Sequence, residues 1–331
     1  MILLLGASGY TGQAFAGELH RRRCLFVPLT RRAMDYTQFD VLFDYVRKMK
    51  PAFIINAAGY TGRPNVEACD LARAETLYAN TLLPQTISRV CLMTNTPWGH
   101  VSSGCIYRGA KVVADGHLQV ERDLGRPELR RLFLKHPQRF RGFTEADEPN
   151  CSFLYPPCSF YSGTKALAEE AINGVGQCYV WRPGIPFNER DHPRNFLSLL
   201  QESSKVYAGL NSLSHLDDFA VACLDLWERS APFGIYNVTN PGAMTTRQVA
   251  ELVQRIFQPG RRFDFEEDGE ASRHFGVEAP RPNCILDSSK LLAAGVKLRP
   301  VRDAVEDALR KWRPATQIVD LARGVSQRAC W

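Results

Sequence analysis

A glycine-rich turn close to the start of the chain constrains its fold more than any other feature. The apolar run Ile2–Leu5 predicts a buried strand, and it passes directly into the sequence Gly6-Ala7-Ser8-Gly9-Tyr10-Thr11-Gly12, where a helical pattern begins. Glycine lacks a Cβ, so the backbone can turn sharply and phosphate oxygens can approach it. The free N–H groups of the following helix add a partial positive charge. Taken alone, the glycine spacing also fits a simple tight turn, but its position after a strand favours a dinucleotide-binding loop. We expect cofactor contacts from Gly6, Ser8, Gly9, Tyr10, Thr11 and Gly12.

Apolar, β-rich runs alternate with helical patterns along the chain, which predicts a parallel sheet covered by helices on both faces. The expected strands are Ile2–Leu5, Cys24–Leu29, Ala52–Ala57, Trp98–Ser102, Gln177–Trp181 and Ile235–Val238. The expected helices are Thr11–Arg22, Gln38–Lys50, Val66–Met93, Phe160–Ile172, Leu216–Arg229, Thr246–Phe257 and Val301–Trp312. We interpret this as an α/β protein with a Rossmann-type, doubly wound parallel sheet in residues 1–187. The strand near 235–238 returns to that sheet, and residues 188–331 mostly form a smaller α/β lobe that binds substrate.

Composition excludes several classes of protein. The 331 residues are 45% hydrophobic and 23% charged, as in an ordinary globular protein, and no apolar run approaches the length of a transmembrane helix. The apolar opening is too short for a signal peptide, so we expect a cytoplasmic enzyme without membrane contact. The ten cysteines form no Cys-x-x-Cys pair, which indicates reduced thiols. The histidines show no ligand spacing, so no metal site is expected.

Residues 108–142 interrupt the alternation and carry nine Lys and Arg against four Asp and Glu, a net charge of +5. A short helix is expected near Glu128–Leu134. The segment is either a solvated surface excursion or a lid or partner-contact element. Nucleic-acid binding is not expected, because no aromatic platform or binding motif accompanies the charge.

The second expected strand indicates which dinucleotide binds. It ends in Leu29-Thr30-Arg31-Arg32, with no acidic residue to hold a ribose 2′-hydroxyl before Asp35. Guanidinium groups bind phosphate, so Arg31 and Arg32 favour NADP(H) over NAD(H), unless both simply face solvent. The small residues after the third strand, Ala57, Ala58 and Gly59, with Tyr60 beside them, suit a strand end that passes under a cofactor.

A second group of residues predicts proton transfer. Tyr161 and Lys165 are four residues apart in a helical stretch, so both project from one face. A nearby ammonium favours the phenolate, and we expect Lys165 to lower the pKa of Tyr161 enough for acid–base work near neutral pH. Ser103, after the fourth strand, could polarise a carbonyl by hydrogen bonding. The Tyr-x-x-x-Lys spacing is weak by itself and gains weight from the glycine loop and the serine strand that precede it.

With these motifs, the chain resembles the extended short-chain dehydrogenase/reductases, and the resemblance runs nearly end to end. Within them it is most similar to the dTDP-4-dehydrorhamnose reductase group, above all to the 3,5-epimerase/4-reductases of plant-type UDP-rhamnose synthesis. The closer match lies in five segments: Thr61-Gly62-Arg63-Pro64-Asn65-Val66-Glu67, Ser103-Gly104-Cys105-Ile106-Tyr107, Pro193-Arg194-Asn195-Phe196, Thr239-Asn240-Pro241-Gly242, and Ala279-Pro280-Arg281-Pro282-Asn283 through Leu286-Asp287-Ser288-Ser289-Lys290.

The resemblance implies NADPH-dependent reduction of the C4 ketone of a UDP- or dTDP-linked 4-keto-6-deoxy sugar. Ser103, Tyr161 and Lys165 would form the catalytic triad. Further cofactor contacts would come from Asp35, Tyr36 and Pro183, and the sugar nucleotide would face Ser103, Gly104, His192, Asn195, Phe196 and Arg281. A homodimer through the helix that bears Tyr161 is also implied.

The resemblance also raises the question of epimerisation at C3 and C5. Cys105 matches the epimerising cysteine of these enzymes, with a buried structural cysteine as the alternative. The partnering lysine falls on Leu199, which cannot transfer a proton. Either His192 substitutes for it, or the chain is a reductase with impaired epimerase activity.

Two other functions occur on a fold of this kind. A 4,6-dehydratase of the same superfamily would carry an Asp-Glu pair where this chain has Gly104-Cys105, which argues against that activity. A non-catalytic regulatory subunit that binds NADP or a sugar nucleotide stays open as the alternative, because the fold alone does not imply catalysis.

Overall fold

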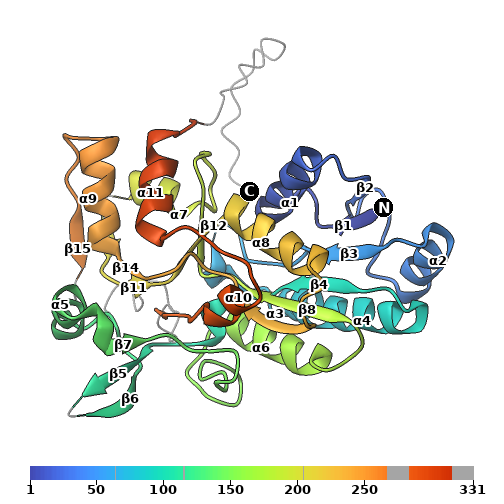
Figure 1. Ribbon diagram of the computed structural model, residues 1–331, viewed down its shortest axis with the longest axis horizontal. Helices are drawn as coiled ribbons and strands as arrows, with labels where there is room; N and C mark the ends of the chain where they lie inside the picture. Colours follow the sequence, from blue (N-terminus) through green and yellow to red (C-terminus); the bar gives the residue numbers. More distant parts are fainter. Residues whose placement is uncertain (64, 115, 204, 267–282, 315–331) are drawn as a thin grey trace.

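The computed structural model describes residues 1–63, 65–114, 116–203, 205–266 and 283–314 (Figure 1). Its centre is a six-stranded, entirely parallel sheet in the order β13-β8-β4-β3-β1-β2. The strands are β1 (Ile2–Leu5), β2 (Phe26–Leu29), β3 (Phe53–Asn56), β4 (Trp98–Val101), β8 (Cys178–Arg182) and β13 (Gly234–Asn237). Each expected strand is present, with ends that shift by up to two residues. The predicted Rossmann-type α/β fold, with its late returning strand, is therefore confirmed.

The strand order reverses between β1 and β3, where the chain turns from building one half of the sheet to the other. In open α/β sheets, ligands bind beyond the carboxyl ends of the strands at this point. β2 forms the outer edge of the sheet and pairs with β1 alone, which explains how it tolerates Pro28. The residues after β2 therefore lie at the same end of the sheet as those after β1 and β3.

Helices cover both faces of this sheet (Figure 1). On one face, α1 (Tyr10–Arg21) and α8 (Leu216–Glu228) pack through Phe15 and Phe219 onto Leu4 of β1. On the other, α2 (Phe39–Met49), α4 (Leu83–Thr94) and α6 (Phe160–Ile172) enclose the alternate side chains of the same strands. The strands are apolar on both sides for this reason.

The long helix expected over Val66–Met93 is not continuous. A 3-10 turn at Val66–Asp70 precedes α3 (Arg73–Leu77), a π-helical turn follows at Tyr78–Leu82, and α4 begins at Leu83. Pro84 lacks the N–H that would bond one turn back, so the regular ladder cannot run through this point. The prediction of one helix was wrong, because it followed the apolar pattern and gave this proline too little weight.

A second lobe lies beyond the carboxyl end of the sheet. Its core joins α7 (Phe196–Glu202), α9 (Thr246–Ile256) and α11 (Val301–Arg310). Short strand pairs complete it: β9 (Ile185–Phe187) with β12 (Leu213–His215), β10 (Lys205–Tyr207) with β15 (Asp264–Glu266), and β11 (Leu210–Asn211) with β14 (Met244–Thr245). α10 (Ser289–Ala293) packs beside β13. α9 starts with a capping box between Thr245 and Gln248, which satisfies the amides of its first turn.

The basic segment 108–142 is folded rather than a loose excursion. Three antiparallel strands, β5 (Ala110–Ala114), β6 (His117–Glu121) and β7 (Phe140–Arg141), are arranged in the order β6-β5-β7. The expected short helix is present as α5 (Pro127–Lys135), and it packs on the sheet through Phe133 and Val112. Leu210 and Ile285 belong to the same apolar cluster, so this insertion is anchored to the second lobe.

Candidate active site

The glycine loop has the geometry that its sequence predicts. Gly6 has φ +76°, and a Cβ there would lie 2.5 Å from the backbone nitrogen of Ala58. A Cβ on Gly12 would lie 2.1 Å from the Gly6 carbonyl oxygen, so α1 can approach the loop only with glycine at that position. Ser8 and Gly9 are exposed at the outside of the turn. The loop therefore leaves its outer backbone open.

The start of α1 suits an anionic ligand. Gly9 caps the helix without any side-chain hydrogen bond, and the first turn contains no acidic residue. The amides of that turn and their share of the helix dipole are therefore available to an anion. A dinucleotide pyrophosphate fits this position, where it would be held by backbone groups from Gly9 onward.

The residues predicted to favour NADP(H) over NAD(H) lie just beyond β2. Arg31 and Arg32 are exposed there, beside the glycine loop. Asp35 is exposed as well, and its Oδ1 accepts hydrogen bonds from the backbone N–H and the hydroxyl of Thr37, which lower the pKa of the carboxyl. Tyr36 is 3% exposed within the core, and its place near the adenosine stays a prediction. The two arginines are exposed cationic groups at this strand end.

The turn after β3 is fixed by two buried asparagines. Asn56 Oδ1 accepts a hydrogen bond from the Ala58 N–H at 3.1 Å. Asn80 Oδ1 accepts from the Tyr60 N–H, and its Nδ2 donates to the Tyr60 carbonyl, both at 2.8 Å. Asn80 lies in the π-helical turn that interrupts the helix, and from there its side-chain amide reaches the backbone of Tyr60. The strand end Ala57–Tyr60 is thereby held rigidly next to the glycine loop.

The predicted catalytic side chains converge on the adjacent strand ends. Ser103 lies two residues beyond β4, and its Oγ accepts the Cys105 N–H at 3.2 Å. α6 begins after the capping residue Ser159 and carries Tyr161 in its first turn and Lys165 one turn later. Lys165 is 4% exposed, and its Nζ donates to the Val101 carbonyl at the end of β4 at 3.0 Å. The same Nζ lies 3.6 Å from the position that a Cβ of Gly59 would occupy.

The electrostatics of this group differ from the prediction. Burial raises the pKa of Tyr161 above its usual range, and an interaction with the Ser103 hydroxyl only partly opposes this. The prediction of a lowered pKa for Tyr161 beside Lys165 was wrong for this structure, because desolvation outweighs the opposing effects of the Ser103 hydroxyl and of Arg194. Burial lowers the pKa of Lys165 itself to about 8. The phenol is therefore a proton donor rather than a phenolate.

Cys105 lies beside this group. The residue as a whole is partly exposed, and its buried thiol interacts with the hydroxyls of Ser103 and Ser162. Burial raises the pKa of the Cys105 thiol, although both serines and Lys165 act in the opposite direction. Gly104 next to it is enclosed: a Cβ there would lie 2.7 Å from Leu286 Cδ1. Gly104 therefore packs against the protein rather than offering a surface to a sugar.

A buried ion pair beneath the catalytic group was not predicted from the sequence. Arg182 donates through Nη2 to Glu169 Oε2 at 2.5 Å, with side chains that are 2% and 5% exposed respectively. Glu169 also accepts the hydroxyl of Ser102, and Arg182 donates to the Tyr107 hydroxyl at 2.9 Å. Glu169 is four residues after Lys165, and this spacing is the sequence feature that places both side chains on one face of the helix. The pair fixes the strand end that leads to Ser103.

The loop before α7 does not present all its expected residues. Asn195 is fully buried: its Oδ1 caps α7 at Leu197, and its Nδ2 donates to the carbonyls of Asn188 and Arg190. In this structure the side-chain amide of Asn195 is thus used within the protein, and its contact with a sugar stays a prediction. Phe196 is partly buried against the lobe core.

Other residues of this loop do lie toward the site. The His192 ring stacks on Tyr10, with ring centroids 4.4 Å apart. Arg194 donates to the carbonyls of Thr61 and Gly62, which joins this lobe to the sheet end. Leu199 is exposed on α7. Arg281 lies outside the described residues.

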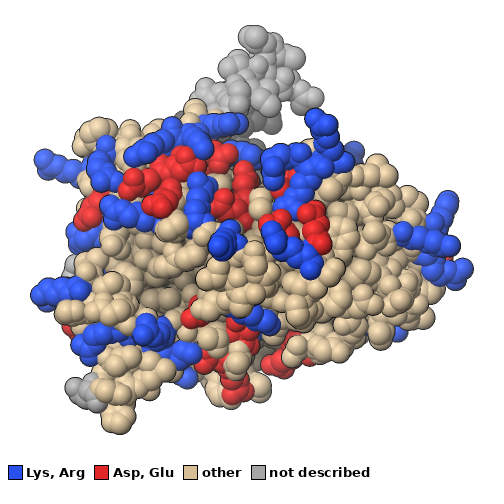
Figure 2. Space-filling model, in the orientation of Figure 1, with Lys and Arg blue, Asp and Glu red and all other residues tan. Residues whose placement is uncertain are grey.

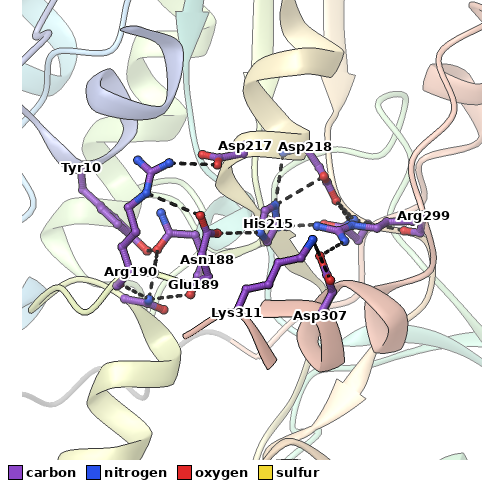
Figure 3. A network of polar contacts seen from close by, with 12 residues as sticks. Tyr10, Asn188, Glu189, Arg190, His215, Asp217, Asp218, Arg299, Asp307 and Lys311 are labelled. Atoms are coloured by element: carbon purple, nitrogen blue, oxygen red, sulfur yellow. Dashed lines mark hydrogen bonds and ion pairs between the residues drawn. The ribbon is translucent and has the colours of Figure 1, made fainter. Parts of the chain in front are cut away.

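A charged network connects the glycine loop to the second lobe (Figure 3). The Tyr10 hydroxyl donates to Asn188 Oδ1 at 3.0 Å. Next to it, His215 lies between Glu189 and Asp218, with nitrogen–oxygen distances of 3.4 Å to each. Burial opposes a charged imidazole, but hydrogen bonds with Asp218 and Glu189 prevail and raise the pKa of His215 to about 9. The network continues through the ion pairs of Arg299 with Asp218 and Asp307.

Within the described part of the chain, no helix has both the length and the apolar character needed to cross a membrane. Nor do the described residues bring three His, Cys, Asp or Glu side chains together in an arrangement that could hold a metal ion. The nine cysteines that the structure describes are free thiols.

The fold and the convergence of Ser103, Tyr161 and Lys165 at the sheet end define a Rossmann-type protein of the dehydrogenase/reductase class. The family model for the RmlD substrate binding domain matches residues 1–313, and the chain belongs to this family.

Two curated relatives come from Arabidopsis thaliana. A bifunctional dTDP-4-dehydrorhamnose 3,5-epimerase/dTDP-4-dehydrorhamnose reductase is 28% identical over 78% of this chain and 77% of its own length. A trifunctional UDP-glucose 4,6-dehydratase/UDP-4-keto-6-deoxy-D-glucose 3,5-epimerase/UDP-4-keto-L-rhamnose-reductase is also 28% identical over 78% of this chain. The aligned region covers 35% of that longer protein, so the chain corresponds to about a third of it.

Solved structures share the fold over nearly the whole chain. The L780 UDP-rhamnose synthase from Acanthamoeba polyphaga mimivirus has a TM-score of 0.76 and 19% identity, covering 94% of this chain and 98% of that one. A dTDP-4-dehydrorhamnose reductase from Bacillus anthracis in complex with NADP has a TM-score of 0.70 and 18% identity, covering 94% and 97%.

Proposed function

We propose that this protein reduces the C4 ketone of a nucleotide-linked 4-keto-6-deoxy sugar with NADPH, as in the synthesis of rhamnose-type sugars. The observation that carries the proposal is the convergence of Tyr161, Lys165 and Ser103 beside the open glycine loop. The names of the relatives and the NADP in one structural neighbour support the reaction class and the cofactor. Arg31 and Arg32 support NADPH, since they are the exposed groups that could bind its 2′-phosphate.

NADPH, when bound, supplies the hydride that adds to C4. Tyr161 holds its proton at neutral pH, because its pKa is raised. It is the proton donor to the C4 oxygen as negative charge develops there. The Ser103 hydroxyl lies next to that phenol and can hydrogen-bond the same oxygen. Lys165, with a pKa of about 8, carries a positive charge at neutral pH that stabilises the phenolate left behind.

Epimerisation is the weaker part of the proposed activity. The Nδ1 of His192 accepts the Arg194 N–H at 3.0 Å, and burial lowers the pKa of the ring. A neutral imidazole whose basic nitrogen is occupied does not replace the missing lysine, and Leu199 has no proton to transfer. Among the described residues considered for epimerisation, Cys105 is left as the candidate that can exchange a proton next to the ketone. We therefore propose a ketoreductase with limited epimerase activity.

The remaining sequence predictions complete the proposal. Residues 1–187 would bind the dinucleotide, and residues 188–331 would mostly bind the UDP- or dTDP-linked sugar. Cytoplasmic location stays a prediction from the sequence.

The test is NADPH oxidation by the purified chain with UDP- and dTDP-linked 4-keto-6-deoxyglucose. Turnover with either sugar, with NADPH preferred over NADH, is the expected result. Tight binding of NADPH without turnover of either sugar would contradict the proposal and favour a regulatory subunit. A Gly17→Ala variant is a suitable control for substitutions of the loop glycines, since a Cβ at this position meets nothing within 4 Å and lies away from the loop.

A further inference from the structure

β6 in the insertion is an edge strand that lacks the usual protection against pairing. It bonds to β5 on one side, and the described residues provide no backbone partner on its other side. The strand contains no proline or lysine, and Leu118 and Val120 are 55% and 49% exposed on one face. Natural proteins usually blunt such an edge with charge, proline or a bulge. An open, apolar edge therefore indicates that another strand covers it.

The backbone of β6 shows which residues would make the new hydrogen bonds. The carbonyl oxygen of Glu121 lies 1.9 Å from the position that a Cβ of Gly109 would occupy, so it is directed toward the β5 side. Backbone groups along an antiparallel strand alternate between its two edges. The N–H and C=O groups of Leu118 and Val120 therefore point to the open edge.

The sequence of β6 is complementary to itself when it runs antiparallel. In His117-Leu118-Gln119-Val120-Glu121, pairing about the middle residue sets Leu118 opposite Val120 of a second strand and His117 opposite Glu121. Leu118 and Val120 are also the residues whose backbone N–H and C=O groups point to the open edge. Pairing them across the two copies therefore makes four backbone hydrogen bonds around a two-fold axis at Gln119. We propose that β6 pairs in this register with β6 of a second copy of the chain, joining two three-stranded sheets into one of six strands.

The charge of the surrounding surface gives each possible occupant a different dependence on salt. Basic side chains gather over the insertion, beside the β5–β6 hairpin (Figure 2). An acidic peptide added to the edge would be attracted by this charge, and its binding would weaken with salt. Two copies of the insertion repel each other, so their pairing strengthens with salt. The complementary register favours the second copy, because an arbitrary acidic strand would not require Leu118, Val120 and the His117–Glu121 match together. This edge is remote from α6, whose face is the alternative dimer surface.

Cysteine cross-linking tests the register directly. At the two-fold axis, Gln119 of one copy lies opposite Gln119 of the other in a non-hydrogen-bonded pair. The Cα atoms of such a pair are about 4.5 Å apart, a distance that a disulfide can bridge. Gln119→Cys should therefore form a covalent homodimer under mild oxidation. His117→Cys is the matched control: position 117 is exposed like position 119 but faces Glu121 of the other copy, so cross-linking should not exceed the wild-type background. A cooperative thermal unfolding transition at the wild-type temperature verifies that both variants fold.

Solution mass measurements complete the test. Leu118→Lys together with Val120→Lys should raise the dimer dissociation constant at least about tenfold, since like charges then stand across the pair. Raising the salt concentration should strengthen the wild-type dimer. Equal cross-linking at positions 117 and 119, no cross-link at 119, or a dimer unaffected by the double substitution would overturn the proposal. The last result would favour the α6 surface instead. None of these outcomes depends on the reductase activity.

Discussion

The buried pair of Glu169 and Arg182 gives the sharpest stability prediction. Glu169→Gln preserves the size of the side chain and its ability to accept the Ser102 hydroxyl, but it removes the negative charge that faces Arg182. The guanidinium, 2% exposed, would lose the carboxylate that it bonds and keep the Tyr107 hydroxyl as an acceptor, with only the smaller electrostatic effect of Glu145 left to oppose its charge. Removing one partner of a buried pair typically costs about 3–5 kcal/mol, a large part of a total stability of about 5–15 kcal/mol.

A double variant that removes both charges should regain most of this stability. Glu169→Leu combined with Arg182→Met removes both charges together and fills the space with apolar atoms, so the free energy of unfolding should return to within about 2 kcal/mol of wild type. Denaturant unfolding followed by tryptophan fluorescence measures all variants. Arg255→Gln is the control, because its pair with Glu306 is surface-exposed and should cost less than about 1 kcal/mol. A Glu169→Gln cost no larger than that of the control, or a double variant as unstable as the sum of the singles, would refute the argument.

Three further results are expected. Gly12→Ala should weaken NADPH binding and lower the melting temperature, since its Cβ would collide with the Gly6 carbonyl, whereas Gly17→Ala should do neither. His215, with its pKa raised to about 9, stabilises the fold fully below about pH 6.5, and about 3 kcal/mol should be lost as the pH rises from there toward 9. His215→Gln should abolish that pH dependence of the unfolding free energy. Cys105→Ser should stop any exchange of sugar ring protons with solvent deuterium while hydride transfer continues, and exchange that persists would exclude Cys105 as the base.

The sequence predicted those parts of the molecule that local pattern determines. The strands are short apolar runs with clear boundaries, and the glycine loop follows from steric need at Gly6 and Gly12, so both could be located without coordinates. The carboxyl ends of parallel strands meet at one sheet edge, which is why residues as distant in sequence as Arg31 and Lys165 could be assigned to one site.

Features that depend on long-range packing could not be predicted. The pKa of Tyr161 depends on how deeply α6 is buried, which spacing along a helix does not reveal. Asn195 belongs to a matching motif, yet its amide is used to cap α7 and hold the loop before it. The Glu169–Arg182 pair joins a helix to a strand, and the insertion gains a core only by packing on Leu210 and Ile285.

Transfer of deuterium from C4-deuterated NADPH to the C4 carbon of the sugar, compared between wild type and Tyr161→Phe, tests the central claim most directly. The account predicts that the phenol is the proton donor, so the variant should bind NADPH almost as well as wild type yet transfer deuterium about 10²–10⁴-fold more slowly. Transfer at the wild-type rate in Tyr161→Phe would contradict it.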